Sequence, residues 1–224
     1  MAQAGAWSYS GIKVFETCPR KYESEKVTKE VVFRDTDATI YGKALHLAAE
    51  EYVRDNKPLE PRFEYVKPFL DKLKALPGEK LCELQMGLKY EDGRFVSCDF
   101  YDEHTYFRGI ADLVVLNGST AFVLDYKTSK NARYADPRQL ALMAACLFTK
   151  YPEIEKIKAA LLFVVSKDMI KSEYHRDSAY DIFAELAPLL TQREMAYKTG
   201  VFNPKPNGLC NRWCNTECPH NGRR

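Results

Sequence analysis

The chain has 224 residues, a length that fits one large domain or one domain with a small appendage. Its 33 basic and 31 acidic side chains leave a net charge of +2, so any nucleic-acid surface has to be local rather than global. No apolar run approaches the roughly 18 residues of a membrane helix. The opening MAQAGAWSYS lacks the charged and apolar regions of a signal peptide. We therefore expect a cytoplasmic protein.

The first third of the chain predicts helices. A short helix with a serine N-cap is expected from residue 8 or 10 to about residue 22. A second helix covers residues 39–54, because apolar side chains recur there at the spacing of a buried helical stripe. A third, weaker helix covers residues 60–76 and stops at Pro77–Gly78.

The periodicity then changes from that of helices to that of strands. Asp92–Gly93 and Asn117–Gly118 are dipeptides typical of two-residue hairpin turns. Asp136 and Pro137 are typical of the N-cap and the first position of a following helix. The strands expected in chain order are 83–91, 94–101, 105–116, 120–128, 154–166 and 169–176, and the helices are 137–150 and 178–199.

The order of these elements predicts a mixed sheet. Strand 120–128, helix 137–150 and strand 157–165 form a natural parallel βαβ unit, and the hairpins before them are antiparallel. The expected fold class is therefore α/β, with a mixed α+β sheet and flanking helices, followed by an irregular tail rich in Pro, Asn and Gly.

Charged residues stand in a strand that is otherwise apolar. Side chains alternate across a strand, so Asp125 and Lys127 in VLDYKTSK share one face. If Asn117–Gly118 forms a two-residue turn, Asp112 lies opposite Val123 and diagonal to Asp125. Two carboxylates in this arrangement can bind the same divalent ion. The alternative is a salt-bridged patch of Asp125 with Lys127, but buried charges cost several kcal/mol unless they are paired or metal-bound.

His46 is a candidate fourth group of this site. In YGKALHLAAEE it lies one helical turn after Gly42 and borders the apolar stripe of its helix. A histidine in such a place is commonly a satisfied core residue. Beside two carboxylates, its neutral imidazole is also a candidate metal ligand.

Five segments in order resemble one family. SYSGIKVFETCPRKY, GKALH, RGIADLVV, VLDYKTSK and QLALMA are similar to motifs of the PD-(D/E)XK nuclease superfamily. More narrowly, they resemble its RecB-like and phage exonuclease branch, including CRISPR-associated RecB-like iron–sulfur nucleases. The resemblance implies a restriction-endonuclease-like core and a single nuclease domain over residues 1–224.

The resemblance also implies roles for individual residues. Lys127 would orient or deprotonate the attacking water. Mg²⁺ or Mn²⁺ would be bound by His46, Asp112, Asp125 and the backbone carbonyl of Tyr126. Glu83 could contact these ligands without binding the metal itself, but we expect it to be an exposed acid at the start of a strand.

Gln139 matches the glutamine that opens the helix after the site strand in the family, and would touch DNA or the site. Its spacing from Asp136 is also that of a capping box, in which it would only close the start of the helix. Four positions later the family often has Tyr, whereas this chain has Met143. A base or phosphate contact from that position is therefore not expected.

Basic residues follow the site strand closely. They could form a rim that tracks DNA phosphates, or a solvated basic loop with no ligand. These DNA-contact candidates are Lys130, Arg133 and Arg138.

The tail holds Cys210, Cys214 and Cys218 at C-x3-C-x3-C spacing, which indicates a metal or cluster site that needs a fourth ligand, Cys18 or His220. Relatives with an iron–sulfur cluster place one cysteine near the N-terminus and three near the C-terminus. The resemblance thus implies a four-iron four-sulfur cluster built by residues 1–30 and 200–224 together. Zn²⁺ on the three tail cysteines with either fourth ligand, or uncoordinated thiols, are the alternatives.

The function implied is a Mg²⁺- or Mn²⁺-dependent DNA exonuclease of phage or prokaryotic recombination, repair or DNA processing. Its substrate would be DNA, and a single-strand annealing or single-strand-binding protein would suit it as a partner. No P-loop motif indicates a helicase motor. The alternatives are a structure-selective endonuclease and a nuclease-dead DNA-binding scaffold.

Overall fold

The computed structural model describes residues 5–32, 34–129 and 132–222. The chain divides into two compact units. One contains residues 1–34 together with 184–224, and the other contains residues 35–183. Within the described residues, no helix combines the length and the apolar character that a membrane span requires.

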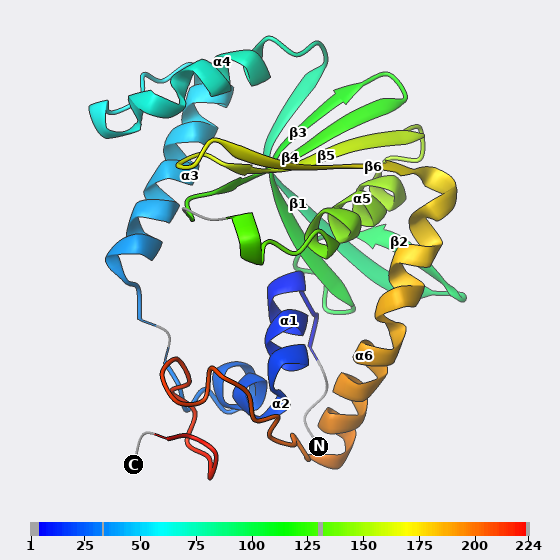
Figure 1. Cartoon of the computed structure of the whole chain (residues 1–224). Coiled ribbons are helices and arrows are strands. Elements are labelled where there is room, and N and C mark those ends of the chain that lie inside the picture. The colour runs from blue at the N-terminus through cyan, green and yellow to red at the C-terminus, as the bar shows by residue number, and fades with distance from the viewer. Residues whose placement is uncertain (1–4, 33, 130–131, 223–224) are drawn as a thin grey trace. The chain divides into compact units, whose positions relative to one another are not determined.

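The second unit is built on a six-stranded mixed sheet (Figure 1). Its order is β2-β1-β3-β4-β5-β6, with β4 and β5 parallel and every other neighbouring pair antiparallel. The predicted parallel βαβ unit is therefore confirmed. The strands are β1 (Glu79–Glu91), β2 (Arg94–Cys98), β3 (Phe107–Asn117), β4 (Thr120–Lys127), β5 (Lys156–Phe163) and β6 (Asp168–His175).

The predicted turn between β3 and β4 is wrong by one residue. Asn117 pairs with Thr120, so Gly118 and Ser119 form the turn, and Gly118 takes the positive φ of 58°. Val114, rather than Asp112, then lies opposite Val123. Each side chain keeps its predicted face, because the partner of every residue moves by two positions along the other strand.

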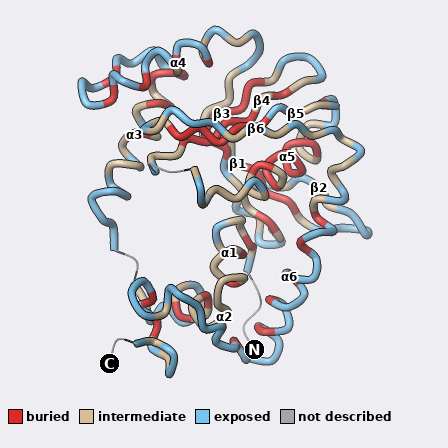
Figure 2. The backbone as a smooth tube through the Cα atoms, viewed as in Figure 1, coloured by how far each residue is buried: buried red, intermediate tan, exposed pale blue. Residues whose placement is uncertain are grey.

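Helices cover both faces of this sheet (Figure 1). The helices α3 (Asp37–Asp55) and α4 (Lys67–Lys74), with a 3-10 turn at Pro61–Val66 between them, pack on the face that carries Leu113, Leu124 and Leu162. The helix α5 (Arg138–Lys150) packs on the other side and is buried along most of its length (Figure 2).

The N-terminus of α5 differs from the predicted cap. Pro137 occupies the N-cap position, one residue later than predicted for Asp136. The Asp136 carboxylate still accepts the Arg138 backbone N–H at 3.0 Å, so it satisfies an amide that the helix itself leaves open. Gln139 makes no capping box there, since its amide donates elsewhere, as described below.

The first unit is small and held by aromatic side chains. It contains α1 (Tyr9–Thr17), α2 (Pro19–Tyr22), a π-helical turn Glu23–Val27 and residues 184–199 of α6 (Ala179–Thr199). The predicted serine cap is confirmed, because the Ser8 hydroxyl accepts the Gly11 N–H at 3.2 Å. Phe15, Tyr22 and Phe202 pack ring against ring. Beyond residue 199 the described tail has no helix or strand.

Candidate active site

Three potential metal ligands meet on the second unit. One ligand atom from each of His46, Glu83 and Asp112 lies within 4.8 Å of the others. Among the described residues, no other group of three His, Cys, Asp or Glu side chains meets this criterion. His46 comes from the middle of α3, Glu83 from β1 and Asp112 from β3. Imidazole and carboxylate are donors that suit Mg²⁺, Mn²⁺ and related divalent ions.

Glu83 occupies a break in the β1–β3 ladder. Cys82 pairs with Leu113 and Leu84 pairs with Ala111, so Glu83 stands opposite Asp112. Its φ of 50° lies in the left-handed region, which is costly for a residue with a side chain and commonly marks a functional site. The expectation of an exposed acid at a strand start was wrong, because β1 begins at Glu79 and Glu83 is half-buried.

Asp112 links the cluster to the backbone of the site strand. Its Oδ1 lies 3.2 Å from His46 Nδ1, and its Oδ2 accepts the Tyr126 backbone N–H at 2.6 Å. The last regular β3–β4 pair is Leu113 with Leu124, so this carboxylate binds the amide just beyond the end of the ladder. Burial lowers the pKa of His46, but the hydrogen bond and charge of Asp112, together with the charges of Asp125 and Glu83, raise it overall.

Asp125 and Lys127 form the second half of the site. Both lie on β4, and Lys127 Nζ is 2.5 Å from Asp125 Oδ2. The other oxygen of Asp125 accepts a hydrogen bond from Gln139 Nε2 at 2.7 Å. The predicted shared face of Asp125 and Lys127 is thus confirmed, and Gln139 contacts the site rather than closing the start of α5.

The site carries more negative charge than its surroundings stabilise. Burial, followed by the charge of Asp112, raises the pKa of Asp125 from 3.8 to about 6 despite the nearby Lys127. Burial and the charges of Asp112 and Glu50 raise the pKa of Glu83 from 4.5 to about 7. A bound divalent cation would remove this repulsion, so the charge distribution fits a metal site.

His46 and Glu83, two of the three potential metal ligands, line an open hollow of about 440 Å³. Gly42, His46, Glu50 and Glu83 line it, so one wall is α3 and the other is β1. A Cβ at Gly42 would lie 3.3 Å from Thr128 Oγ1, which shows how closely the residue after β4 approaches α3 here. A phosphodiester can therefore reach the cluster from outside.

A family model of the PD-(D/E)XK nuclease superfamily matches residues 6–221. The chain belongs to this superfamily. Two solved structures are similar to it. A candidate exonuclease from Eubacterium rectale has a TM-score of 0.52 and 13% identity over 94% of this chain and 87% of that one. The protein SSO0001 has a TM-score of 0.49 and 14% identity over 99% and 89%. No curated protein matches the chain at a significant level.

The name of the superfamily describes an acid followed two positions later by lysine, and Asp125 and Lys127 have this spacing on β4. That they are the motif of this chain, with Asp112 as its first acid, stays a prediction. The mixed sheet with flanking helices is the PD-(D/E)XK restriction-endonuclease-like fold.

Two of the predicted DNA-contact residues of this nuclease, Arg133 and Arg138, lie around the start of α5. Arg133 is exposed in the 3-10 turn before it. Arg138 Nη2 lies 2.8 Å from Asp136 Oδ2, so an ion pair already engages this guanidinium. Lys130 lies outside the described residues. Contact with DNA stays a prediction for all three.

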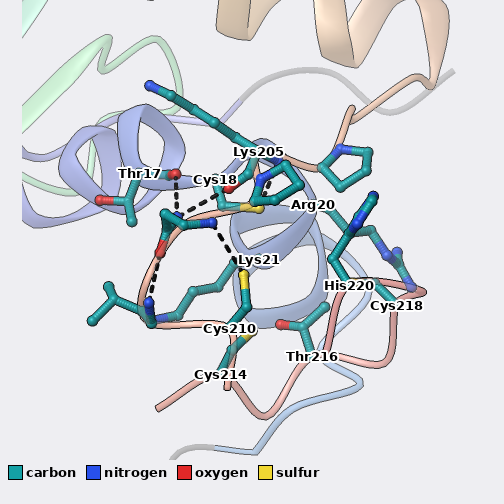
Figure 3. Close-up of a pocket in the computed structure, with 14 residues that line it drawn as sticks. Thr17, Cys18, Arg20, Lys21, Lys205, Cys210, Cys214, Thr216, Cys218 and His220 are labelled. Carbon is teal, nitrogen blue, oxygen red and sulfur yellow. Dashed lines mark hydrogen bonds between the residues drawn. The ribbon is translucent and has the colours of Figure 1, made fainter. Parts of the chain in front are cut away.

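The predicted cysteine site lies in the first unit. Cys18, Cys210, Cys214 and Cys218 line one pocket with His220 (Figure 3). The Cys18 thiol accepts the Lys205 backbone N–H at 3.3 Å, and the Cys210 thiol accepts that of Asn207 at 3.4 Å. The first of these hydrogen bonds connects Cys18, near the N-terminus, to Lys205, which lies 187 positions later in the chain. The four predicted ligands thus share a pocket, as a common metal site requires.

Proposed function

We propose that this nuclease is a divalent-metal-dependent DNA exonuclease that hydrolyses phosphodiester bonds at DNA ends. The observation that carries the proposal is the meeting of His46, Glu83 and Asp112 beside the Asp125–Lys127 pair. The fold likeness to the candidate exonuclease from Eubacterium rectale supports action at ends. Recombination, repair or phage DNA processing are the settings that suit such an enzyme.

His46, Glu83, Asp112 and Asp125 would hold Mg²⁺ or Mn²⁺, with the Tyr126 carbonyl as a further ligand. Such an ion neutralises the scissile phosphate and lowers the pKa of bound water. Asp112 has a second task, since it also fixes the Tyr126 amide and so ties the ligand set to β4.

Lys127 places a positive charge next to the ligand cluster. Its ammonium, held by Asp125, can donate to the attacking water or to a phosphate oxygen and stabilise the developing negative charge. Gln139 keeps the Asp125 carboxylate in one orientation, because it occupies the oxygen that Lys127 does not contact. Asp125 therefore presents a fixed geometry to a metal and a substrate.

We propose a four-iron four-sulfur cluster on Cys18, Cys210, Cys214 and Cys218. Zinc with Zn–S bonds of about 2.3 Å would bring its sulfur ligands to about 3.8 Å from one another. The four cysteines line one pocket, which a shared four-iron four-sulfur cluster requires, and the same pocket could also hold zinc. Iron and labile sulfide in anaerobically purified protein would support it, whereas stoichiometric zinc without iron would contradict it.

The test of the exonuclease is digestion of linear and circular DNA, each in single-stranded and double-stranded form, with Mg²⁺, Mn²⁺ or EDTA. We expect metal-dependent loss of linear DNA and survival of the closed circles. Cutting of closed circles would instead indicate a structure-selective endonuclease. Binding without any cutting would indicate a nuclease-dead scaffold.

Substitutions test whether the proposed site is responsible for DNA cleavage. Asp125→Asn and Lys127→Met should each reduce the rate by at least about 1,000-fold, since both remove transition-state stabilisation. Lys158→Met is the matched control, because Lys158 is an exposed lysine on the neighbouring strand β5. Equal activity of Lys127→Met and the control would contradict the assignment.

A further inference from the structure

A second pocket of about 270 Å³ lies between α4 and the turn that joins β5 to β6. Its walls are mostly apolar, and they include the rings of Tyr65, Phe69 and Phe163 and the side chain of Met169. It lies wholly within the unit formed by residues 35–183. The role proposed above for the metal cluster uses none of these side chains.

Two of the rings in this pocket face no other aromatic ring. Among the described residues, Tyr65 and Phe69 make no ring–ring contact, whereas the nearby Tyr41 and Phe63 pack against each other. Tyr65 is 41% exposed, although its hydroxyl is held 2.9 Å from that of Tyr41. A fixed and open aromatic face is what a stacking ligand needs.

Two lysines at the rim have no acidic partner. Within the described part of the chain, Lys72 and Lys167 form no ion pair, although both are exposed and line the pocket. The neighbouring Lys67 shows the contrast, since it lies 2.9 Å from Asp71. The exposed carboxylate of Asp168 also lines the pocket, so the two lysines leave its edge with a net charge of +1. An apolar, aromatic hollow with a positive edge suits a flat base attached to phosphates.

The pocket is joined directly to the proposed catalytic strand. Phe163, in its wall, pairs with Lys127 in the parallel β4–β5 ladder. The next residue, Val164, also lines the pocket and donates its backbone N–H to the Lys127 carbonyl at 3.0 Å. Neighbouring strands lie about 4.8 Å apart, so the pocket wall stands next to the catalytic lysine's backbone.

We propose that this pocket holds one unpaired nucleobase of single-stranded DNA whose backbone runs on to the metal cluster. The inference rests on the proposed function and narrows its substrate to DNA with at least one unpaired nucleotide at the site. The base stacks between Tyr65 and Phe69, and Lys72 and Lys167 contact the phosphates that flank it. A base inside a duplex is stacked on its neighbours and does not enter.

The test uses labelled 12-nucleotide single strands in which an abasic residue replaces one base at a time. Binding is measured by fluorescence anisotropy with Ca²⁺ in place of Mg²⁺. In the wild type we expect one position at which the abasic residue weakens binding about 10-fold, the range of one base–aromatic stack. In Phe69→Ala and in Tyr65→Ser that penalty disappears, and affinity for a duplex of the same sequence is unchanged.

The salt dependence tests the lysines separately. Replacing Lys72 and Lys167 by Ala should lower the slope of log K against log salt by about 1.4, since each single-strand phosphate contact contributes about 0.7. Lys158→Ala, an exposed lysine at the far end of β5, should leave the slope unchanged.

The two proposals fail in different ways. Absence of Mn²⁺-dependent degradation of the unmodified strand by the wild type contradicts the proposed nuclease. If the wild type degrades the unmodified strand but no abasic position weakens binding, the proposed base pocket is wrong and the proposed nuclease activity stands. A penalty that survives in both Phe69→Ala and Tyr65→Ser overturns it as well, and leaves the hollow as a site for an apolar partner.

Discussion

Replacing Asp125 by Asn should make the metal-free protein more stable at pH 8. The side chain is 5% exposed, and burial with the charge of Asp112 raises its pKa from 3.8 to about 6. Each pKa unit corresponds to about 1.36 kcal/mol, so the ionised carboxylate lowers the free energy of unfolding by about 3 kcal/mol. Asn keeps the shape and still accepts the Gln139 hydrogen bond, but carries no charge. Its amide nitrogen replaces the oxygen next to Lys127, whose side chain is 31% exposed and can turn to solvent.

The sign follows from proton linkage. A carboxyl whose pKa is raised in the folded state binds its proton more tightly there than in the unfolded chain. Its stabilising contribution is complete below pH 3.8 and is lost as the pH rises through about 6. The wild type should therefore lose stability between pH 4 and pH 7 more steeply than Asp125→Asn does.

The assay is thermal unfolding in EDTA from pH 4 to pH 8, followed by circular dichroism. At pH 8 we expect the Tm of Asp125→Asn to exceed that of the wild type by about 6–12 °C, taking 2–4 °C per kcal/mol for a chain of this size. Glu153→Gln, which removes an exposed carboxylate, is the matched control. Equal Tm values and equal pH slopes for Asp125→Asn and the wild type would refute the reasoning from burial.

Three further predictions concern single side chains. Glu83→Gln should weaken Mn²⁺ binding, measured by calorimetry, at least about 10-fold. In the wild type we expect Mn²⁺ affinity to rise between pH 6 and pH 8, because Glu83, with a pKa of about 7, loses its proton there, and the variant should show a smaller rise. Unchanged affinity would exclude Glu83 as a metal ligand. Gln139→Ala should lower kcat about 10-fold with an unaltered circular dichroism spectrum, because Asp125 loses its orienting donor; wild-type kcat would make that contact dispensable. Ser8→Ala should cost about 1 kcal/mol in the unit that contains α1, measured by urea unfolding, and Ser8→Asp should restore it.

The face of the sheet on which Asp125 and Lys127 lie could be predicted, because side chains alternate between the two faces of any strand. Asp125 and Lys127 are two positions apart on a strand, so they share a face whatever the partner strand does. The turn was misplaced by one residue, since both Asn117–Gly118 and Gly118–Ser119 put glycine where a positive φ is needed. The error moved Asp112 along its partner strand but not to the other face.

The role of Glu83 could not be predicted from the pattern around it. Its place opposite Asp112 depends on a register set by long-range pairing of β1 with β3, and its left-handed backbone has no signal in a residue that is not glycine. Gln139 was ambiguous for another reason, because capping and site contact demand the same residue at the same spacing. Only the position of Asp125 decides between them.

The discontinuity of the first unit has a consequence for folding. Residues 35–183 form a unit of their own and separate the two segments that build the other one. During synthesis the nuclease sheet can fold while residues 1–34 still have no partner, because α6 and the cysteine tail are made later. A folded insert holds its two ends at a fixed separation, which shortens the loop that closure has to span. Substitutions that slow folding of the sheet should therefore also delay assembly of the cysteine pocket. This pocket brings together Cys18 and Lys205, which are 187 positions apart in the chain.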